Sequence, residues 1–115
     1  MKGTGFTKSQ KKIARIIIEK GLQKEFADGI VKLENTISKW KAKTFSNREA
    51  WYELYEKLTK HDKHIARRYD SMSGSRYLDT IARQLAEGAV KVDDLEDFNE
   101  DVREKIFFLS GIDNE

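Results

Sequence analysis

The chain has 115 residues, neither cysteine nor proline, and 22 Lys and Arg residues against 20 Asp and Glu residues. This length is typical of one domain, and the absence of cysteine excludes disulfide bonds and thiolate metal sites and fits a reducing compartment. No apolar run is long enough to cross a membrane and no signal-peptide pattern is present, so we expect a cytoplasmic protein without a membrane partner.

The small net charge of +2 hides an uneven distribution of charge along the chain. Residues 1–44 contain eleven Lys and Arg residues against four Asp and Glu residues, whereas residues 70–115 contain five against twelve. A basic start and an acidic end favour head-to-tail contact between copies or a polarised surface for a partner. Ordinary solvated helix faces are the alternative interpretation.

The first predicted helix runs from about residue 9 to residue 42. A helix of this length reaches roughly 50 Å, whereas a compact domain of this size has a radius of gyration of about 13 Å. We therefore expect the helix to extend beyond the rest of the chain and a second copy to cover its apolar stripe. Six residues spaced by three or four form this predicted dimer interface: Leu22, Phe26, Ile30, Leu33, Ile37 and Trp40.

Two details of the first helix stay open at this stage. Thr7 and Ser9 are both suitable N-caps. Gly29 lies on the same side of the helix as Leu22 and Leu33, where it either lets another helix approach closely or marks a kink.

A second helix is predicted to begin after Ser46, because Ser46 and Glu49 have the spacing of a capping box. Its polar residues His61 and Asp62 interrupt an otherwise apolar stripe. Adjacent aromatic residues cannot share one buried face of a helix, so part of this helix should face an interface. The stripe consists of Trp51, Leu54, Tyr55, Leu58, Ile65 and Tyr69, and Tyr52 follows directly after Trp51.

The remainder of the chain predicts short helices joined by turns. A helix begins at about residue 76 and ends near Gly88, a helical turn covers residues 93–96, and Asn99 caps a last helix. The inward positions are predicted to be Leu78, Ile81, Ala82, Leu85, Val102, Ile106 and Phe107. The fold class is therefore all-α, as a single helical domain over residues 1–115, with stalk helices over about 8–69 and head helices over about 76–110.

The sequence contains no catalytic motif, so we expect neither an enzyme nor a cofactor. His61 and His64 lie one helical turn apart, with Asp62 and Glu56 nearby, but the chain has no third imidazole and we expect no metal site. The main alternative function is nucleic-acid binding through the basic first helix, although the acidic last third would repel a phosphate backbone. Its basic residues include Lys8, Lys11, Lys12 and Arg15.

Several stretches resemble the fluorescence recovery protein family of cyanobacteria and its homologues in other bacteria. They are "IEKGLQKEF" at 18–26, "WYELYEKL" at 51–58, "IARRYD" at 65–70, "IARQLAEG" at 81–88 and "DLEDFNEDVREKI" at 94–106. The resemblance implies an all-helical homodimer with a long stalk and a small head. It also implies a non-enzymatic regulator that binds the orange carotenoid protein, a carotenoid-binding photoreceptor, and speeds its return to the resting state.

The resemblance also suggests which residues contact the partner. The tryptophan of the family falls on Tyr52, its histidine on Tyr55 and its aspartate on Glu56, which preserves the charge. The functional arginine of the family falls on Asp62, where the charge is reversed, and a phenylalanine of the head falls on Ile81. Together with the aromatic argument above, the expected partner-binding residues are Trp51, Tyr52, Tyr55, Glu56, Arg68, Asp70, Ile81 and Arg83.

Overall fold

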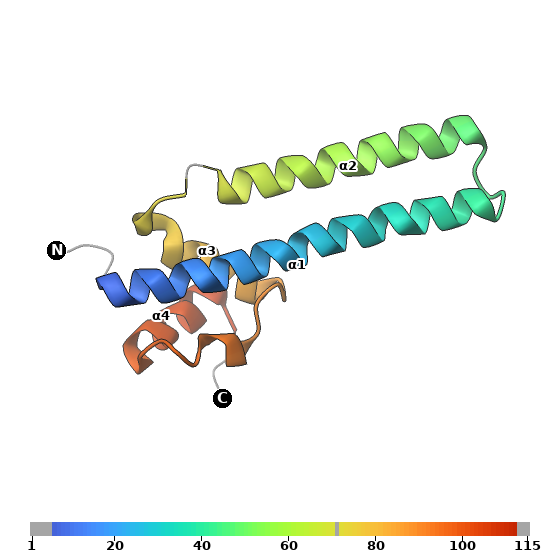
Figure 1. The fold of residues 1–115 in the computed structure, drawn as a ribbon. Coiled ribbons are helices and arrows are strands. Elements are labelled where there is room, and N and C mark those ends of the chain that lie inside the picture. The colour runs from blue at the N-terminus through green and yellow to red at the C-terminus, as the bar shows by residue number, and fades with distance from the viewer. Residues whose placement is uncertain (1–5, 71, 113–115) are drawn as a thin grey trace. The chain divides into compact units, whose positions relative to one another are not determined.

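A computed structural model describes residues 6–70 and 72–112, and 80% of these residues are in helices. No strand occurs within these ranges, which confirms the all-α prediction. The predicted long first helix is also confirmed. The elements are α1 (Lys8–Lys41), α2 (Asn47–Tyr69), η1 (Gly74–Arg76), α3 (Tyr77–Ala86), η2 (Val92–Leu95) and α4 (Glu100–Ser110) (Figure 1).

The chain divides into two compact units, and α1 contributes to both. The first unit contains α1 up to Gln23 together with the segment after residue 70, and the second unit spans Lys24–Asp70. The sequence assigned the whole first helix to the stalk, whereas its first four turns belong with the small C-terminal helices. The reason is apolar burial, because Ala14, Ile17 and Ile18 of α1 are buried in the first unit.

The core of the first unit joins α1, α3, α4 and the segment between α3 and α4. The positions predicted to face inward on α3 and α4 are buried, apart from Leu78, which is half-buried. α1 approaches this core closely at Gly21, where an added Cβ would lie 2.6 Å from Gln84 Cδ. The buried apolar residues are Ala14, Ile17, Ile18, Ile81, Ala82, Leu85, Val90, Leu95, Phe98, Val102, Ile106 and Phe107.

Side-chain caps fix where the helices begin. Thr7 rather than Ser9 caps α1, because its Oγ1 accepts the Gln10 N–H at 3.1 Å. The predicted capping box of α2 is confirmed: the Glu49 N–H donates to Ser46 Oγ at 3.1 Å, and the Ser46 N–H donates to Glu49 Oε1 at 2.9 Å. The hydrogen bond that the Ser46 backbone N–H donates to the Glu49 carboxylate lowers the pKa of Glu49. Asn99 caps α4 as expected, by accepting the Val102 N–H at 3.0 Å.

The second unit is an antiparallel hairpin of α2 and the second part of α1 (Figure 1). At the end of α1, the Thr44 N–H donates to Lys39 O and the Lys43 N–H donates to Trp40 O, both at 2.9 Å. These two bonds form a Schellman motif. Lys43 occupies its left-handed position with a φ of 65°, where glycine is the usual residue.

Candidate functional site

Polar and small residues line the side of α1 that faces α2 in the hairpin. Glu25, Gly29 and Thr36 are all buried there. Thr36 Oγ1 accepts a hydrogen bond from Lys57 Nζ at 2.8 Å. A Cβ on Gly29 would lie 2.5 Å from the imidazole ring of His61, so this glycine permits a close helix approach rather than a kink. Polar groups of both helices therefore contribute directly to the contact between α1 and α2.

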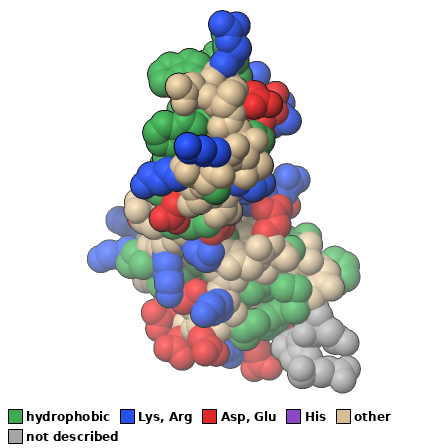
Figure 2. Space-filling model, turned by 90° about the vertical axis from the view of Figure 1, so that its right-hand side faces the viewer, with side chains coloured by type: hydrophobic (Ala, Val, Ile, Leu, Met, Phe, Trp, Pro, Cys, Tyr) green, Lys and Arg blue, Asp and Glu red, His purple; other side chains and the backbone are tan. Residues whose placement is uncertain are grey.

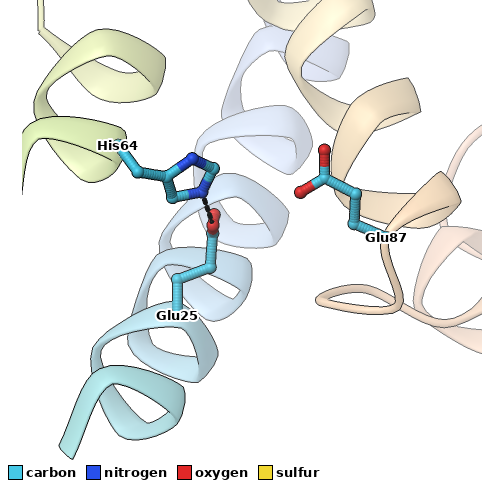
Figure 3. A group of neighbouring side chains, drawn as sticks. All are labelled: Glu25, His64 and Glu87. Atoms are coloured by element: carbon cyan, nitrogen blue, oxygen red, sulfur yellow. Dashed lines mark hydrogen bonds and ion pairs between the residues drawn. The ribbon is translucent and has the colours of Figure 1, made fainter. Parts of the chain in front are cut away.

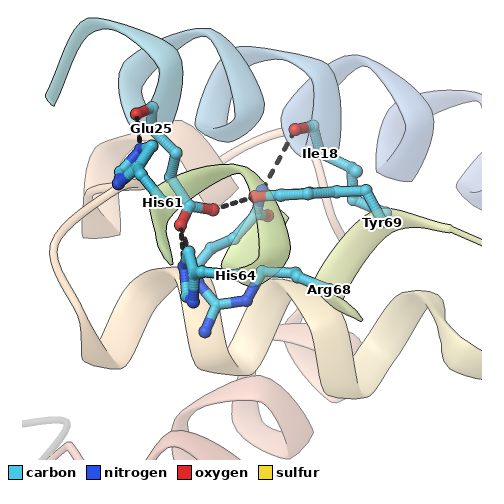
Figure 4. A network of polar contacts seen from close by, with 7 residues as sticks. Ile18, Glu25, His61, His64, Arg68 and Tyr69 are labelled. Atoms are coloured by element: carbon cyan, nitrogen blue, oxygen red, sulfur yellow. Dashed lines mark hydrogen bonds and ion pairs between the residues drawn. The ribbon is translucent and has the colours of Figure 1, made fainter. Parts of the chain in front are cut away.

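Glu25 is the centre of a hydrogen-bond network within the hairpin (Figure 4). Its side chain is only 7% exposed, and its carboxylate accepts from His64 Nε2 at 2.6 Å, from Arg68 Nη1 at 3.1 Å and from the Tyr69 hydroxyl. His61 Nε2 donates to the Glu25 backbone carbonyl at 2.6 Å. This contact explains the polar gap in the stripe of α2, because α1 of the same chain supplies the partner of His61.

The network offers few ligands for a metal ion. Within the hairpin, Glu25 and His64 bring two candidate ligand atoms together (Figure 3), whereas structural zinc sites usually have four ligands. The His61 nitrogen Nε2 is already bound to a backbone carbonyl. Glu87, also drawn in Figure 3, belongs to the first unit. The alternative in which His61 and His64 act together as metal ligands therefore gains no support from the hairpin geometry.

The predicted apolar stripe of α1 is largely outside the contact with α2. Phe26, Ile30, Ile37 and Trp40 are exposed, and Ile30 reaches 66% exposure. Leu22 and Leu33 are half-buried. At 3.6 residues per turn, the stripe lies about 70–80° around the helix from the polar contact side. Pairing with α2 therefore leaves most of this apolar surface in contact with solvent.

α2 has a matching exposed stripe. Trp51, Tyr52, Tyr55 and Leu58 are all exposed, and Trp51 reaches 71%. We call the exposed stripes of α1 and α2 together the outer face of the hairpin; hydrophobic side chains at the surface are visible in Figure 2.

The two stripes meet near the end of the hairpin in a groove of about 330 Å³. It is lined by Ile37, Trp40, Asn47, Ala50, Trp51 and Leu54. Trp40 Nε1 donates to Asn47 Oδ1 at 2.7 Å, which holds one indole at the groove. The groove therefore places apolar residues of both helices on one side of the hairpin.

Two of the predicted partner-binding residues are not exposed. Ile81 is fully buried in the core of the first unit, so it cannot present a contact to a partner. The Arg68 side chain is only 8% exposed and binds Glu25, so its role is internal. Both residues were expected at an interface because the sequence does not show which residues of the same chain pack against them.

The other predicted partner-binding residues are exposed. Glu56 forms an ion pair with Lys60 on α2 at 3.7 Å, and Arg83 forms one with Asp79 on α3 at 3.3 Å. Asp70 caps the end of α2 through its backbone N–H, which donates to Ala66 O at 2.9 Å.

Three residues of the polar contact were not predicted from the sequence: Glu25, Thr36 and Lys57. Their signal was weak, because each lies beside an apolar stripe and resembles an ordinary solvated residue. The polar gap at His61 was the one available hint, since a histidine inside a stripe needs a hydrogen-bond partner when it is buried.

Comparison with known proteins adds no family assignment, since no family model, curated protein or solved structure matches this chain. Among the described residues, no helix combines the length and the apolar character needed to cross a membrane.

Proposed function

We propose that this chain is a non-enzymatic helical regulator that forms a homodimer and binds a partner protein. The observation that carries the proposal is the outer face of the hairpin. Burying a large apolar side chain is worth about 1.5–3 kcal/mol, and this face leaves at least seven such side chains exposed. They are Phe26, Ile30, Ile37, Trp40, Trp51, Tyr55 and Leu58.

The polar contact between α1 and α2 supports a role for a second copy. The pairing of α1 with α2 leaves several large apolar side chains of the hairpin exposed, so an additional apolar contact would supply further stabilisation. The α1 stripe is continuous over Phe26 to Trp40, which suits helix-to-helix pairing between copies. The exposed Trp51 and Tyr52 are residue types that often anchor protein interfaces.

A matched pair of substitutions tests the role of the outer face in the homodimer. Ile30→Glu places a charge in the α1 stripe, whereas Val31→Glu places one outside the stripe, about 100° further around the same helix, where Val31 is also exposed. We expect sedimentation at micromolar concentration to show more monomer for Ile30→Glu and the native population for Val31→Glu. Equal effects of the two substitutions would contradict dimerisation through this stripe.

The resemblance to the fluorescence recovery protein family supplies the partner to be tested first. We propose a carotenoid-binding photoreceptor-like protein, and the assay follows the absorbance of a photoactivated orange carotenoid protein as it returns to rest. We expect the native chain to accelerate the return, Trp51→Ala to accelerate it less, and Val92→Ala, a change in the first unit, to match the native chain. No acceleration by the native chain would contradict this choice of partner.

Nucleic-acid binding through the basic first helix is the alternative function. It is the weaker proposal, because Arg15 donates to the Tyr77 hydroxyl at 3.2 Å and Lys20 pairs with Asp94, so two cations of the helix are already engaged. A titration of generic DNA at several salt concentrations tests it. Affinity that falls steeply with salt would favour this alternative, because phosphate contacts release counterions.

A further inference from the structure

The first unit contains a second candidate surface, separate from the outer face of the hairpin. Ile13, Ile16 and Ile17 of α1 form the floor of a groove of about 240 Å³, and residues of and after η2 form its other wall. Small-molecule pockets usually enclose about 300–1,000 Å³. The groove is therefore of a size that suits a side chain of another protein better than a free ligand.

The floor of the groove has an apolar residue that the chain itself leaves uncovered. Ile17 is buried in the core, but Ile16 next to it is 66% exposed. An exposed isoleucine that lines a groove offers apolar contact to whatever enters.

The rim of the groove is acidic. Asp93, Glu96 and Asp97 line it and are exposed. Within residues 6–70 and 72–112, none of these three carboxylates forms an ion pair. Asp94 differs, because its pairing with Lys20 fixes it to α1 and lowers its pKa. Three carboxylates at the rim thus remain available to a partner.

The charge of the rim selects the chemistry of the partner. The acidic character continues into α4, which begins with Glu100 and Asp101 and contains Glu104 one turn later. Phosphate groups of nucleic acids and anionic lipids would be repelled by this surface. Lysine and arginine would be attracted, and an apolar side chain between them would fit over Ile16.

We propose that this groove, called here the acidic groove, binds a basic amphipathic segment of a partner protein. An apolar side chain of the segment would rest on Ile16, and its lysine or arginine residues would pair with Asp93, Glu96 and Asp97. Amphipathic helices bind grooves of this kind through their apolar face. Complementary charge would mainly speed the encounter and set the specificity. The proposal does not depend on dimerisation, because every lining residue belongs to the first unit.

The probe for this proposal is a short fluorescent helical peptide made of leucine and lysine, with a leucine and glutamate peptide as its control. Binding to the full chain is measured by fluorescence anisotropy at low salt. The groove variant combines Asp93→Asn, Glu96→Gln and Asp97→Asn. A matched variant, Asp28→Asn with Glu34→Gln and Asp62→Asn, makes the same change of net charge in the hairpin. A third variant, Ile16→Ser, alters only the floor, and circular dichroism verifies that all variants are folded.

We expect the lysine peptide to bind and the glutamate peptide not to bind. The groove variant should weaken binding about tenfold, equivalent to about 1.4 kcal/mol, and Ile16→Ser should also weaken it, whereas the matched hairpin variant should leave it unchanged. Equal loss in the two charge variants would show non-specific attraction and overturn the proposal. So would an absence of binding by the native chain, or an unchanged affinity in Ile16→Ser.

A second copy of the chain is the remaining occupant to be distinguished. If the groove variant lowers the molar mass of the chain in solution, the acidic groove is a contact between copies and the proposed partner is wrong. If the mass is unchanged while peptide affinity falls, the proposal stands, whatever the outcome of the tests on Ile30 and Trp51.

Discussion

Replacing Glu25 with glutamine should destabilise the hairpin, because Glu25 is a buried carboxylate that accepts three side-chain hydrogen bonds. An amide is nearly the same size but lacks the charge, and its NH₂ group must face one of the donors His64, Arg68 or Tyr69. One hydrogen bond to a charged group is worth at least about 1.5 kcal/mol, and removing one partner of a buried ion pair costs up to about 5 kcal/mol. We expect a loss of about 3 kcal/mol in the free energy of unfolding, between these limits.

Urea unfolding followed by circular dichroism measures this loss, with all variants at one protein concentration because association would shift the midpoint. Glu34→Gln is the matched control, since Glu34 is exposed on the same helix and should change stability by less than about 0.5 kcal/mol. Glu25→Leu should be more harmful than Glu25→Gln, and adding Arg68→Met should recover part of the loss by removing the buried cation. Equal stability of Glu25→Gln and Glu34→Gln would refute the importance of this network.

Three further predictions concern the backbone and the response to pH. Lys43→Gly should raise the thermal midpoint, because relieving the left-handed strain of a residue with a side chain gains about 1 kcal/mol. Gly21→Ala should lower the midpoint despite its better helix propensity, since the new methyl group would collide with Gln84; an unchanged midpoint would contradict the close approach. Hydrogen bonding to Lys20 lowers the pKa of Asp94 in the folded chain, so its stabilising contribution is present above its ordinary pKa of 3.8 and is lost as the pH falls through the lowered value. The stability difference between the native chain and Asp94→Asn, measured by urea unfolding, should therefore shrink from pH 7 toward pH 3.

Local signals in the sequence were sufficient to predict the helices and their caps. Ser46, Glu49 and Asn99 act on backbone groups within a few residues, so their roles can be read without knowledge of the tertiary structure. The inward positions of α3 and α4 were also predictable, because one apolar face of each short helix repeats at helical spacing.

The contact side of α1 could not be predicted in the same way. The apolar stripe suggested that this side would be the main contact, yet α2 packs against the neighbouring side that contains Glu25, Gly29 and Thr36. A hydrogen-bonded pair such as His61 and Glu25 depends on two residues far apart in the chain. Periodicity describes one helix at a time and contains no information on such pairs.

The molar mass of the native chain in solution tests the central claim most directly, because the claim is that a second copy covers the outer face of the hairpin. Multi-angle light scattering at micromolar concentration should give twice the chain mass of 13.4 kDa. A mass of one chain across the concentration range would contradict the proposed homodimer.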